Sequence, residues 1–593
     1  MNIEKILEKG YFPKELPPGF YTKKLAEKIS VIKSTWNNYY TDQTTKNQNE
    51  SNRDFKSRKN LFIKKYSSSK SCEYSLSKGK LSRRILKIPN PKHFIKLSEL
   101  INNEWNEIES FYKISNYSNS FPIEETNIQN RSVRTFSKNV QSLRDKIIEK
   151  SINKLVQVKV DISKFYPTIY THTISWSLLG KSKAKEYYAK TKTEIDSLIA
   201  SGDSDAKLYK YADELDSAIR ACQDKQSIGI PIGPDTSHII SEIITCRIDK
   251  EFETMFNHLN VECCRYYDDY YFYVNTQDEA DIVIKGILKI LNKYQLEIND
   301  KKVKIEEYPF SFENKWVTDL HRFEFKQTNF SNSLKHYFSL VWGIGKDNKS
   351  KTDWIFKYSL RTFEFGAIKI PQNNWKTFEN LLIKTALFQP AILDVLTRIF
   401  LSYKSYINSD SKEKIKDLIE SVINIHSPVN HSFEISWALW LAKSFEIKIE
   451  KEIADKIIET KDPCSILILL CIDKTHNNVN GTPNYTLIEN DLKDNILFSE
   501  SWILAYQACK NGWLTPTEAR LIENNEYFKI LKNYDVDFFD CSRQLKPYFI
   551  IEEKPENAGL DEVLKNILSQ LDSKIESEKT EEEETFFDIS NLF

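Results

Sequence analysis

Two adjacent aspartates, Asp268 and Asp269, are the side chains of this chain best suited to do chemistry. They lie within residues 265–274 (Arg-Tyr-Tyr-Asp-Asp-Tyr-Tyr-Phe-Tyr-Val), where aromatic and β-branched residues favour strands. Neighbouring carboxylates repel each other, and a tight turn is better served by Asn-Gly or Asp-Gly. We therefore expect a β-hairpin whose tip carries two acids because they bind a divalent metal ion.

A third acid, Asp161, ends another predicted strand, which reads Val-Lys-Val-Asp-Ile over residues 158–162. Carboxylates on rigid elements can hold two metal ions roughly 3.5–4 Å apart, an arrangement that stabilises phosphoryl transfer. Mg²⁺ suits a site with few carboxylates plus substrate phosphates. We expect two Mg²⁺ ions bound by Asp161 and Asp268, with the backbone carbonyl of Ile162 as a further ligand and Asp269 assisting.

The segments between these acids predict the elements that must position them. Apolar residues recur at helical spacing from Phe94 to Tyr112, and a helix then leads toward Leu155. Residues 175–226 form a charged, helix-forming insertion. Residues 229–234 (Gly-Ile-Pro-Ile-Gly-Pro) predict a rigid turn, because prolines restrict the backbone and glycines permit unusual conformations. Further predictions are helices from Thr236 and from Asp278, a strand over 303–305, and a mobile loop over 40–60.

Helical periodicity dominates after about residue 350. The segments Ser436-Trp437-Ala438-Leu439 and Ser501-Trp502-Ile503-Leu504 resemble each other, which hints at stacked helical hairpins. The predicted fold is α+β, a right-hand polymerase with fingers and palm, followed by an all-α, helical-repeat-like domain. The expected boundaries are 1–345 for fingers and palm, 346–570 for the helical domain and 571–593 for an acidic, disordered tail.

The net charge of zero hides a strong asymmetry. Residues 51–100 hold 14 Lys and Arg against 3 Asp and Glu, whereas residues 551–593 hold 4 against 13. The basic region favours a polyanionic partner. No apolar run approaches the roughly 18–20 residues needed to span a membrane, and the first residues lack an apolar signal core. The nine cysteines form no CxxC pair. We expect a cytoplasmic protein with free thiols.

Four motifs in order resemble the palm of reverse transcriptases. They are residues 161–166 (Asp-Ile-Ser-Lys-Phe-Tyr), the turn 229–234 with Ser237, residues 266–269 (Tyr-Tyr-Asp-Asp), and residues 296–299 (Leu-Glu-Ile-Asn) followed by Lys302. Each tetrapeptide alone is weakly specific, but the ordered set is specific and covers residues 155–310. The resemblance implies an RNA-directed DNA polymerase with Asp161, Asp268 and Asp269 as its catalytic, metal-binding acids.

The resemblance also implies roles for nucleotide-binding residues. Tyr166 aligns with the steric gate that excludes a 2′-hydroxyl, although Phe165 could take that place because neighbouring strand residues face opposite ways. Arg84 resembles the fingers arginine that grips the triphosphate, with Arg83 as the alternative and Lys78 or Lys80 assisting. Lys302 resembles the lysine near the leaving pyrophosphate.

One position departs from the family pattern, because Ile232 stands where many reverse transcriptases have Gln. The whole set, with residues 11–18, 84–91 and the helical C-terminal half, resembles bacterial defence-associated reverse transcriptases of the abortive-infection group. Within that group it is similar to the AbiK-like enzymes or to the second polymerase of a two-reverse-transcriptase antiphage system. That resemblance implies non-canonically templated or protein-primed DNA synthesis, and Tyr39 and Tyr40 are the first priming candidates.

The partners implied are dNTPs, a DNA product, an RNA template or non-coding RNA, a second reverse transcriptase subunit and further copies of this chain. Two alternatives stay open. One is a mobile-element enzyme of the intron or retron type. The other is a nucleic-acid-binding scaffold with an inactive polymerase fold.

Overall fold

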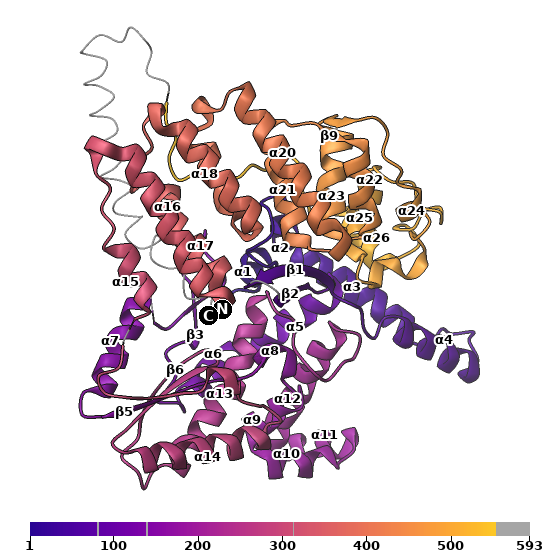
Figure 1. The fold of residues 1–593 in the computed structure, drawn as a ribbon. Coiled ribbons are helices and arrows are strands. Elements are labelled where there is room, and N and C mark those ends of the chain that lie inside the picture. Colours follow the sequence, from indigo (N-terminus) through magenta and orange to yellow (C-terminus); the bar gives the residue numbers. More distant parts are fainter. Residues whose placement is uncertain (80–81, 138–139, 312, 553–593) are drawn as a thin grey trace, which may run out of the picture.

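The computed structural model describes residues 1–79, 82–137, 140–311 and 313–552. The expected acidic tail at 571–593 and Lys80 lie outside these residues. Figure 1 shows a helical lobe, formed by the C-terminal half, above a smaller lobe built around a β-sheet.

The sheet of the palm has four strands in the order β6-β7-β5-β8, and each neighbouring pair is antiparallel. The strands are β5 (Val156–Asp161), β6 (Glu262–Tyr266), β7 (Asp269–Val274) and β8 (Lys304–Glu307). Helices α13 (Asp235–Met255) and α14 (Gln277–Lys293) pack with them in one hydrophobic core. The predicted hairpin and both predicted helices are therefore present.

Shorter elements surround this sheet. The apolar stretch from Phe94 to Tyr112 is two helices rather than one, because the helix breaks at Glu104. The insertion at 175–226 is helical, as predicted. The elements are α5 (Pro91–Asn103), α6 (Trp105–Tyr112), β3 (Pro122–Glu124), β4 (Val133–Thr135), α7 (Val140–Ser151), α8 (Phe165–Thr168), α9 (Thr173–Leu179), α10 (Lys181–Tyr188), α11 (Lys192–Ala200) and α12 (Ser204–Ala221).

The N-terminal region contains four helices and a hairpin. They are α1 (Ile3–Lys9), α2 (Lys23–Glu27), α3 (Ile29–Thr44), α4 (Asn52–Lys65), β1 (Cys72–Lys78) and β2 (Ser82–Ile88). The prediction of a loop over 40–60 was wrong, because α3 continues to Thr44 and α4 begins at Asn52. The Ser51 side chain accepts a hydrogen bond from the Asp54 N–H and so caps α4, a local signal that the polar composition concealed.

The C-terminal half is almost wholly helical. Its α-helices are α15 (Lys315–His321), α16 (Phe330–Asp347), α17 (Thr352–Glu364), α18 (Trp375–Phe388), α19 (Leu393–Ser402), α20 (Ser409–His426), α21 (Ser432–Phe445), α22 (Lys451–Glu459), α23 (Pro463–Leu470), α24 (Thr486–Glu489), α25 (Trp502–Lys510) and α26 (Glu526–Asn533). Helices α16, α18, α20 and α22 pack in one series, and α17, α19, α21, α23 and α25 pack in a second. The assignment of a repeat family stays a prediction.

Two large hydrophobic cores divide the molecule in a way that the predicted boundaries did not anticipate. One core joins apolar residues from 6–95 with others from 316–545, and the second gathers residues from 97–296. The fingers hairpin thus shares its core with the helical half, while α16 runs through the expected boundary at 345. Among the helices of the described ranges, none combines the length and the apolar character needed to cross a bilayer.

Candidate active site

The strand register brings the three predicted acids together at one edge of the palm sheet. Asp161 of β5 lies directly opposite Asp269 of β7. The backbone N–H of Ile162 donates to the carbonyl oxygen of Asp268 at 3.2 Å. Tyr267 takes a left-handed conformation, with φ of 53°, in the turn between β6 and β7. Asp161 and Asp268 are far apart in the sequence, and the antiparallel pairing of β5 with β7 brings their backbones close together.

The electrostatics of these acids favour a bound cation. Burial, together with repulsion by Asp269 and Asp161, raises the pKa of Asp268 to about 7. Burial also raises the pKa of Asp269. Asp161 is 5% exposed and accepts from the Lys302 Nζ at 2.6 Å and from the Asn299 Nδ2 at 3.2 Å. Hard carboxylate oxygens that repel one another fit a divalent ion such as Mg²⁺.

A buried ion network beneath the hairpin was not predicted from the sequence. The Arg265 side chain is fully buried and donates to Glu242 Oε1 at 2.6 Å and to Asp249 Oδ1 at 3.0 Å. Its Nη1 also donates to the Tyr267 carbonyl at 3.0 Å, which supports the turn that presents Asp268. Residues 263–266 of β6 are all buried, so the alternation of the strand's faces did not single out Arg265.

The predicted rigid turn at 229–234 joins the fingers to the palm. Gly233 has a φ of +122°, and a Cβ there would lie 2.6 Å from Pro13 Cγ. The Ile232 carbonyl accepts from the Lys87 N–H of β2 at 2.8 Å, and its side chain packs against the core shared by fingers and helical half. An apolar residue at this position is therefore explained by packing. The Arg131 Nε secures the turn by donating to Asp235 at 2.8 Å.

The structure distinguishes the two aromatic candidates for the sugar contact. Both residues line the cleft, and they lie on helix α8 rather than on the strand that the sequence predicted. They differ in burial, because Phe165 is 4% exposed and belongs to the palm core, whereas Tyr166 is half-buried. The two rings meet edge to face with centroids 5.4 Å apart. The Tyr166 hydroxyl accepts from the Ser241 hydroxyl at 3.4 Å. This placement is consistent with Tyr166 as the gate, which stays a prediction.

The two fingers arginines have different surroundings. Arg83 donates to both Glu434 oxygens, at 2.6 and 2.7 Å, and so binds β2 to α21. Arg84 lines the cleft together with Lys78, and each of the two cations lies close enough to influence the other. Adjacent strand residues face opposite sides of a hairpin, which explains why Arg83 binds α21 and Arg84 does not.

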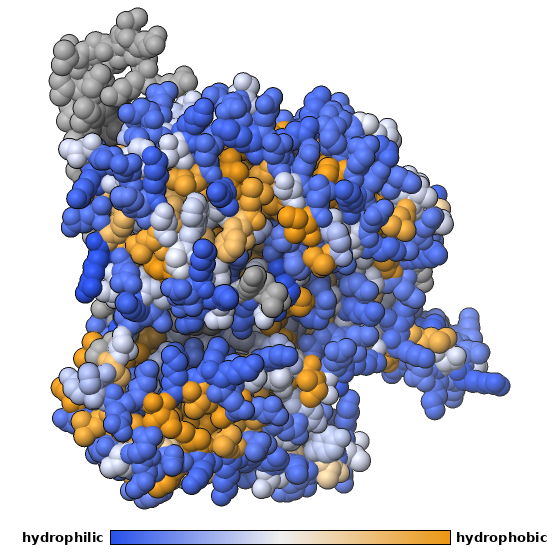
Figure 2. Space-filling view, viewed as in Figure 1, coloured by the Kyte–Doolittle hydropathy of each residue, from blue (hydrophilic) through white to orange (hydrophobic). Residues whose placement is uncertain are grey.

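A single cleft of 4510 Å³ connects these groups, and Figure 2 shows the molecule hollowed between its two lobes. Asp161, Asp268, Asp269, Arg84, Tyr166 and Lys302 all line it. So does Lys351, which sequence reasoning missed because it belongs to the segment between α16 and α17 of the helical half. The Gly79 N–H donates to Asp353 Oδ1 at 3.0 Å, so the fingertip contacts the first turn of α17, directly after Lys351. Tyr39 and Tyr40 lie on α3, outside the cleft lining.

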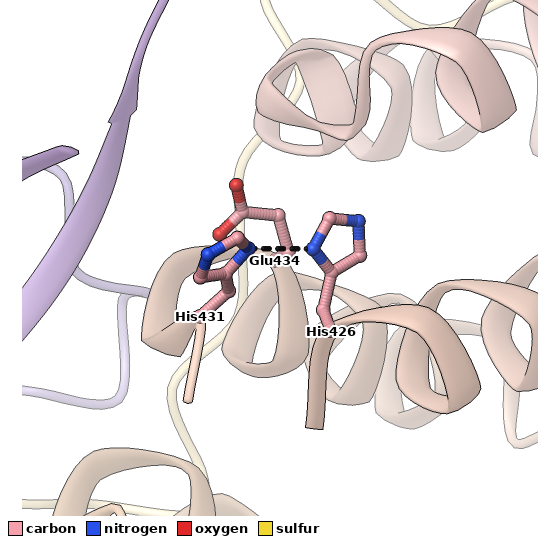
Figure 3. A group of neighbouring side chains, drawn as sticks. All are labelled: His426, His431 and Glu434. Carbon is pink, nitrogen blue, oxygen red and sulfur yellow. Dashed lines mark hydrogen bonds between the residues drawn. The ribbon is translucent and has the colours of Figure 1, made fainter. Parts of the chain in front are cut away.

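One histidine and glutamate cluster lies outside the palm (Figure 3). His426, His431 and Glu434 place potential ligand atoms within 4.8 Å of one another. No other group in the part of the chain that the structure describes meets this spacing, and the set of Asp161, Asp268 and Asp269 does not meet it either. The two Nδ1 atoms are 2.8 Å apart, a hydrogen-bonding distance. Because Glu434 accepts from Arg83 through both oxygens, we assign this cluster to the support of β2.

Residues 108–328 match the family model described as reverse transcriptase (RNA-dependent DNA polymerase). The match spans the palm sheet and all three aspartates. The chain therefore contains a reverse transcriptase domain, and this domain identifies it as an RNA-directed DNA polymerase. None of the curated proteins matches the chain.

Solved structures of yeast telomerase resemble the chain weakly. Apo telomerase from Candida tropicalis has 12% identity and a TM-score of 0.28, covering 70% of this chain and 72% of that one. Telomerase from Candida albicans with a fragment of telomeric RNA has 12% identity and a TM-score of 0.25, covering 74% and 68%. The corresponding Candida tropicalis complex has 14% identity and a TM-score of 0.28, covering 75% and 68%. Similarity at this level carries no argument about activity.

Proposed function

We propose that this chain is a bacterial antiphage reverse transcriptase that adds deoxynucleotides at the site formed by Asp161, Asp268 and Asp269. The observation that supports this most directly is the pairing of β5 with β7, which sets Asp161 opposite Asp269 and joins Ile162 to Asp268. An inactive scaffold would have no need for acids that are buried close together, where burial and then mutual repulsion raise the pKa of Asp268.

The chain's own groups supply binding and orientation. Asp161, Asp268 and Asp269, with the Ile162 carbonyl, would hold two Mg²⁺ ions, which when bound neutralise charge on the attacking and leaving oxygens. Arg84 and Lys78 can bind the triphosphate from the fingers side of the cleft. Tyr166, which lines the cleft, would contact the sugar. Lys302 can exchange its ion pair with Asp161 for a contact with the leaving pyrophosphate.

The defence role is supported by the resemblance of the motif set and of the helical C-terminal half to abortive-infection enzymes. The two helix series of that half offer extended surfaces of the kind that bind partners. We propose an RNA template, activity in the cytoplasm and assembly with further copies or a second polymerase subunit. DNA synthesis could instead start on a protein primer, and the experiment below distinguishes this from copying of a primed template.

The test is incorporation of each labelled dNTP by purified protein, with and without an RNA template and DNA primer, followed by protease treatment of the product. We expect Mg²⁺-dependent incorporation that Asp268→Asn with Asp269→Asn abolishes. A matched control is Asp281→Asn on exposed α14. Retained incorporation by the double variant would refute the site. Product that loses its protein attachment only after protease would indicate a protein primer.

A further inference from the structure

Helices α3 and α4 form an arm that projects from the body of the protein (Figure 1). No residue between 28 and 72 belongs to the cleft lining. The base of the arm is rigid, because the ring of Phe62 packs against Tyr39 and Tyr66, with centroids 5.5 and 5.2 Å apart, and Tyr66 packs on Tyr527 of α26. The arm is therefore held in place by packing, and we look for its role outside the catalytic cleft.

The connection between the two helices is also fixed. The Arg58 Nε donates to Glu50 Oε1 at 2.8 Å, and its Nη1 donates to the Gln43 carbonyl at 2.7 Å. The only acid on α4 is Asp54, which accepts from the Ser51 hydroxyl at the N-cap. Arg58 thus helps to build the arm, and the one acid of α4 is engaged at the N-cap rather than paired with the cations of the outer face.

The outer face of α4 carries a stripe of unneutralised cations. Arg53, Lys56, Asn60 and Lys64 follow each other at helical spacings of three or four residues, on the side opposite buried Phe62. All four are exposed, and Arg53, Lys56 and Lys64 form no ion pair with any acid of the described ranges. Figure 2 shows the projecting end of the arm as mainly hydrophilic.

We propose that this stripe binds the phosphodiester backbone of the template RNA where that strand extends beyond the cleft. From Arg53 to Lys64 the helix rises about 16 Å, a length that can contact more than one phosphate of a nucleic-acid strand. Arginine and lysine contacts to phosphate are independent of sequence and position the strand. The inference rests on the proposed function, because it takes RNA as the template of this polymerase.

The test compares two primed RNA templates, labelled with a fluorophore, in binding to the full-length protein. One template ends close to the primed region, and the other carries an unstructured RNA extension. The variant Arg53→Glu with Lys56→Glu and Lys64→Glu should bind the extended template roughly tenfold or more weakly than wild type does. It should also lower the salt slope by about 2–3, while its affinity for the short template stays the same.

A matched control reverses three exposed lysines elsewhere, with Lys192→Glu, Lys285→Glu and Lys289→Glu. It carries the same charge change and should keep wild-type affinity for both templates. A second control, Leu61→Ser, removes an exposed apolar side chain of the arm, which is 66% exposed, and should also bind normally.

Several outcomes would overturn the inference. They are unchanged binding of the extended template by the arm variant, equal weakening on both templates, or equal weakening by Leu61→Ser. Incorporation of dNTPs on the short template is measured in parallel. If wild type fails there, the proposed function fails. If only the extension effect is missing, the arm assignment alone fails.

Discussion

Arg83 of β2 and Glu434 of α21 form a two-bonded ion pair, at 2.6 and 2.7 Å, that ties the fingers hairpin to the helical half. Both arginines line the cleft, but Arg84 forms no ion pair with an acid of the described residues and lies near Lys78. Tyr74 of β1 also packs edge to face on Phe433 of α21, with centroids 6.4 Å apart. The position of β2, the strand that carries Arg84, is therefore set by helices that follow the reverse transcriptase match in sequence.

We expect Arg83→Met or Glu434→Gln to destabilise the fold by about 3 kcal/mol, because removing one partner leaves the other charged and poorly solvated. The Glu434 side chain is 2% exposed and that of Arg83 is 18% exposed. A double-mutant cycle by denaturant unfolding measures the coupling. Arg84→Met is the comparison and should stay within about 0.5 kcal/mol of wild type. Equal effects at Arg83 and Arg84 would contradict the division of the two arginines.

Acidification should weaken the same junction through His426 and His431. Burial and the nearby Arg83 lower the pKa of both imidazoles below 6.5, so the unfolded chain binds more protons as pH falls. Their contribution to stability is complete above about pH 6.5 and is lost below it. We expect the free energy of unfolding to drop from pH 7.5 to 5.5 more steeply in wild type than in His426→Gln with His431→Gln. Exposed His336→Gln provides the control. Parallel pH profiles would contradict this prediction.

Replacement of Arg84 should affect nucleotide binding rather than stability. Hydrogen bonds to charged groups contribute about 1.5–3 kcal/mol, so Arg84→Ala should raise the KM for dNTPs by roughly ten- to a hundredfold. Steady-state incorporation at varied dNTP concentration gives this value, and Lys285→Ala on α14 is the control. An unchanged KM would place the triphosphate away from the fingers hairpin.

Sugar selectivity should depend on Tyr166 and not on Phe165. Tyr166→Val opens space beside the cleft, so incorporation of ribonucleotides relative to deoxynucleotides should rise. Phe165→Leu alters the palm core, where Phe165 is 4% exposed, and should lower stability without changing that ratio. Competition between a labelled rNTP and its dNTP distinguishes the two variants. A shift in the ratio with Phe165→Leu alone would move the gate to that residue.

Sequence patterns within short segments were enough to predict the acids of the palm and the turn at 229–234. Strand-forming residues flank Asp161 and Asp268, and the prolines of the turn at 229–234 restrict its backbone. The remaining parts depend on contacts between distant segments. Glu434 shows no local sign of binding Arg83, and Asp353 none of accepting from Gly79. Residues 40–60, which include parts of α3 and α4, were predicted to be a loop because their composition is polar. The capping signal at Ser51, which marks the start of α4, was overlooked.

Lys351 should contribute to nucleic-acid or triphosphate binding although it lies outside the reverse transcriptase match. It lines the cleft on the segment between α16 and α17, close enough to Asp269, Lys159 and Lys302 to interact electrostatically with each. Enclosure by the cleft walls, with Lys159 acting in the same direction, lowers its pKa.

A phosphate beside Lys351 would relieve the repulsion among these lysines, so Lys351→Ala should raise the KM for primed template or dNTP by roughly tenfold. Lys346→Ala, on α16 and outside the cleft lining, is the matched control. Thermal melting shows whether the Lys351 variant stays folded. If both variants retain wild-type KM values, the helical half contributes no charge to the active site, and its role there reduces to holding the fingers in place.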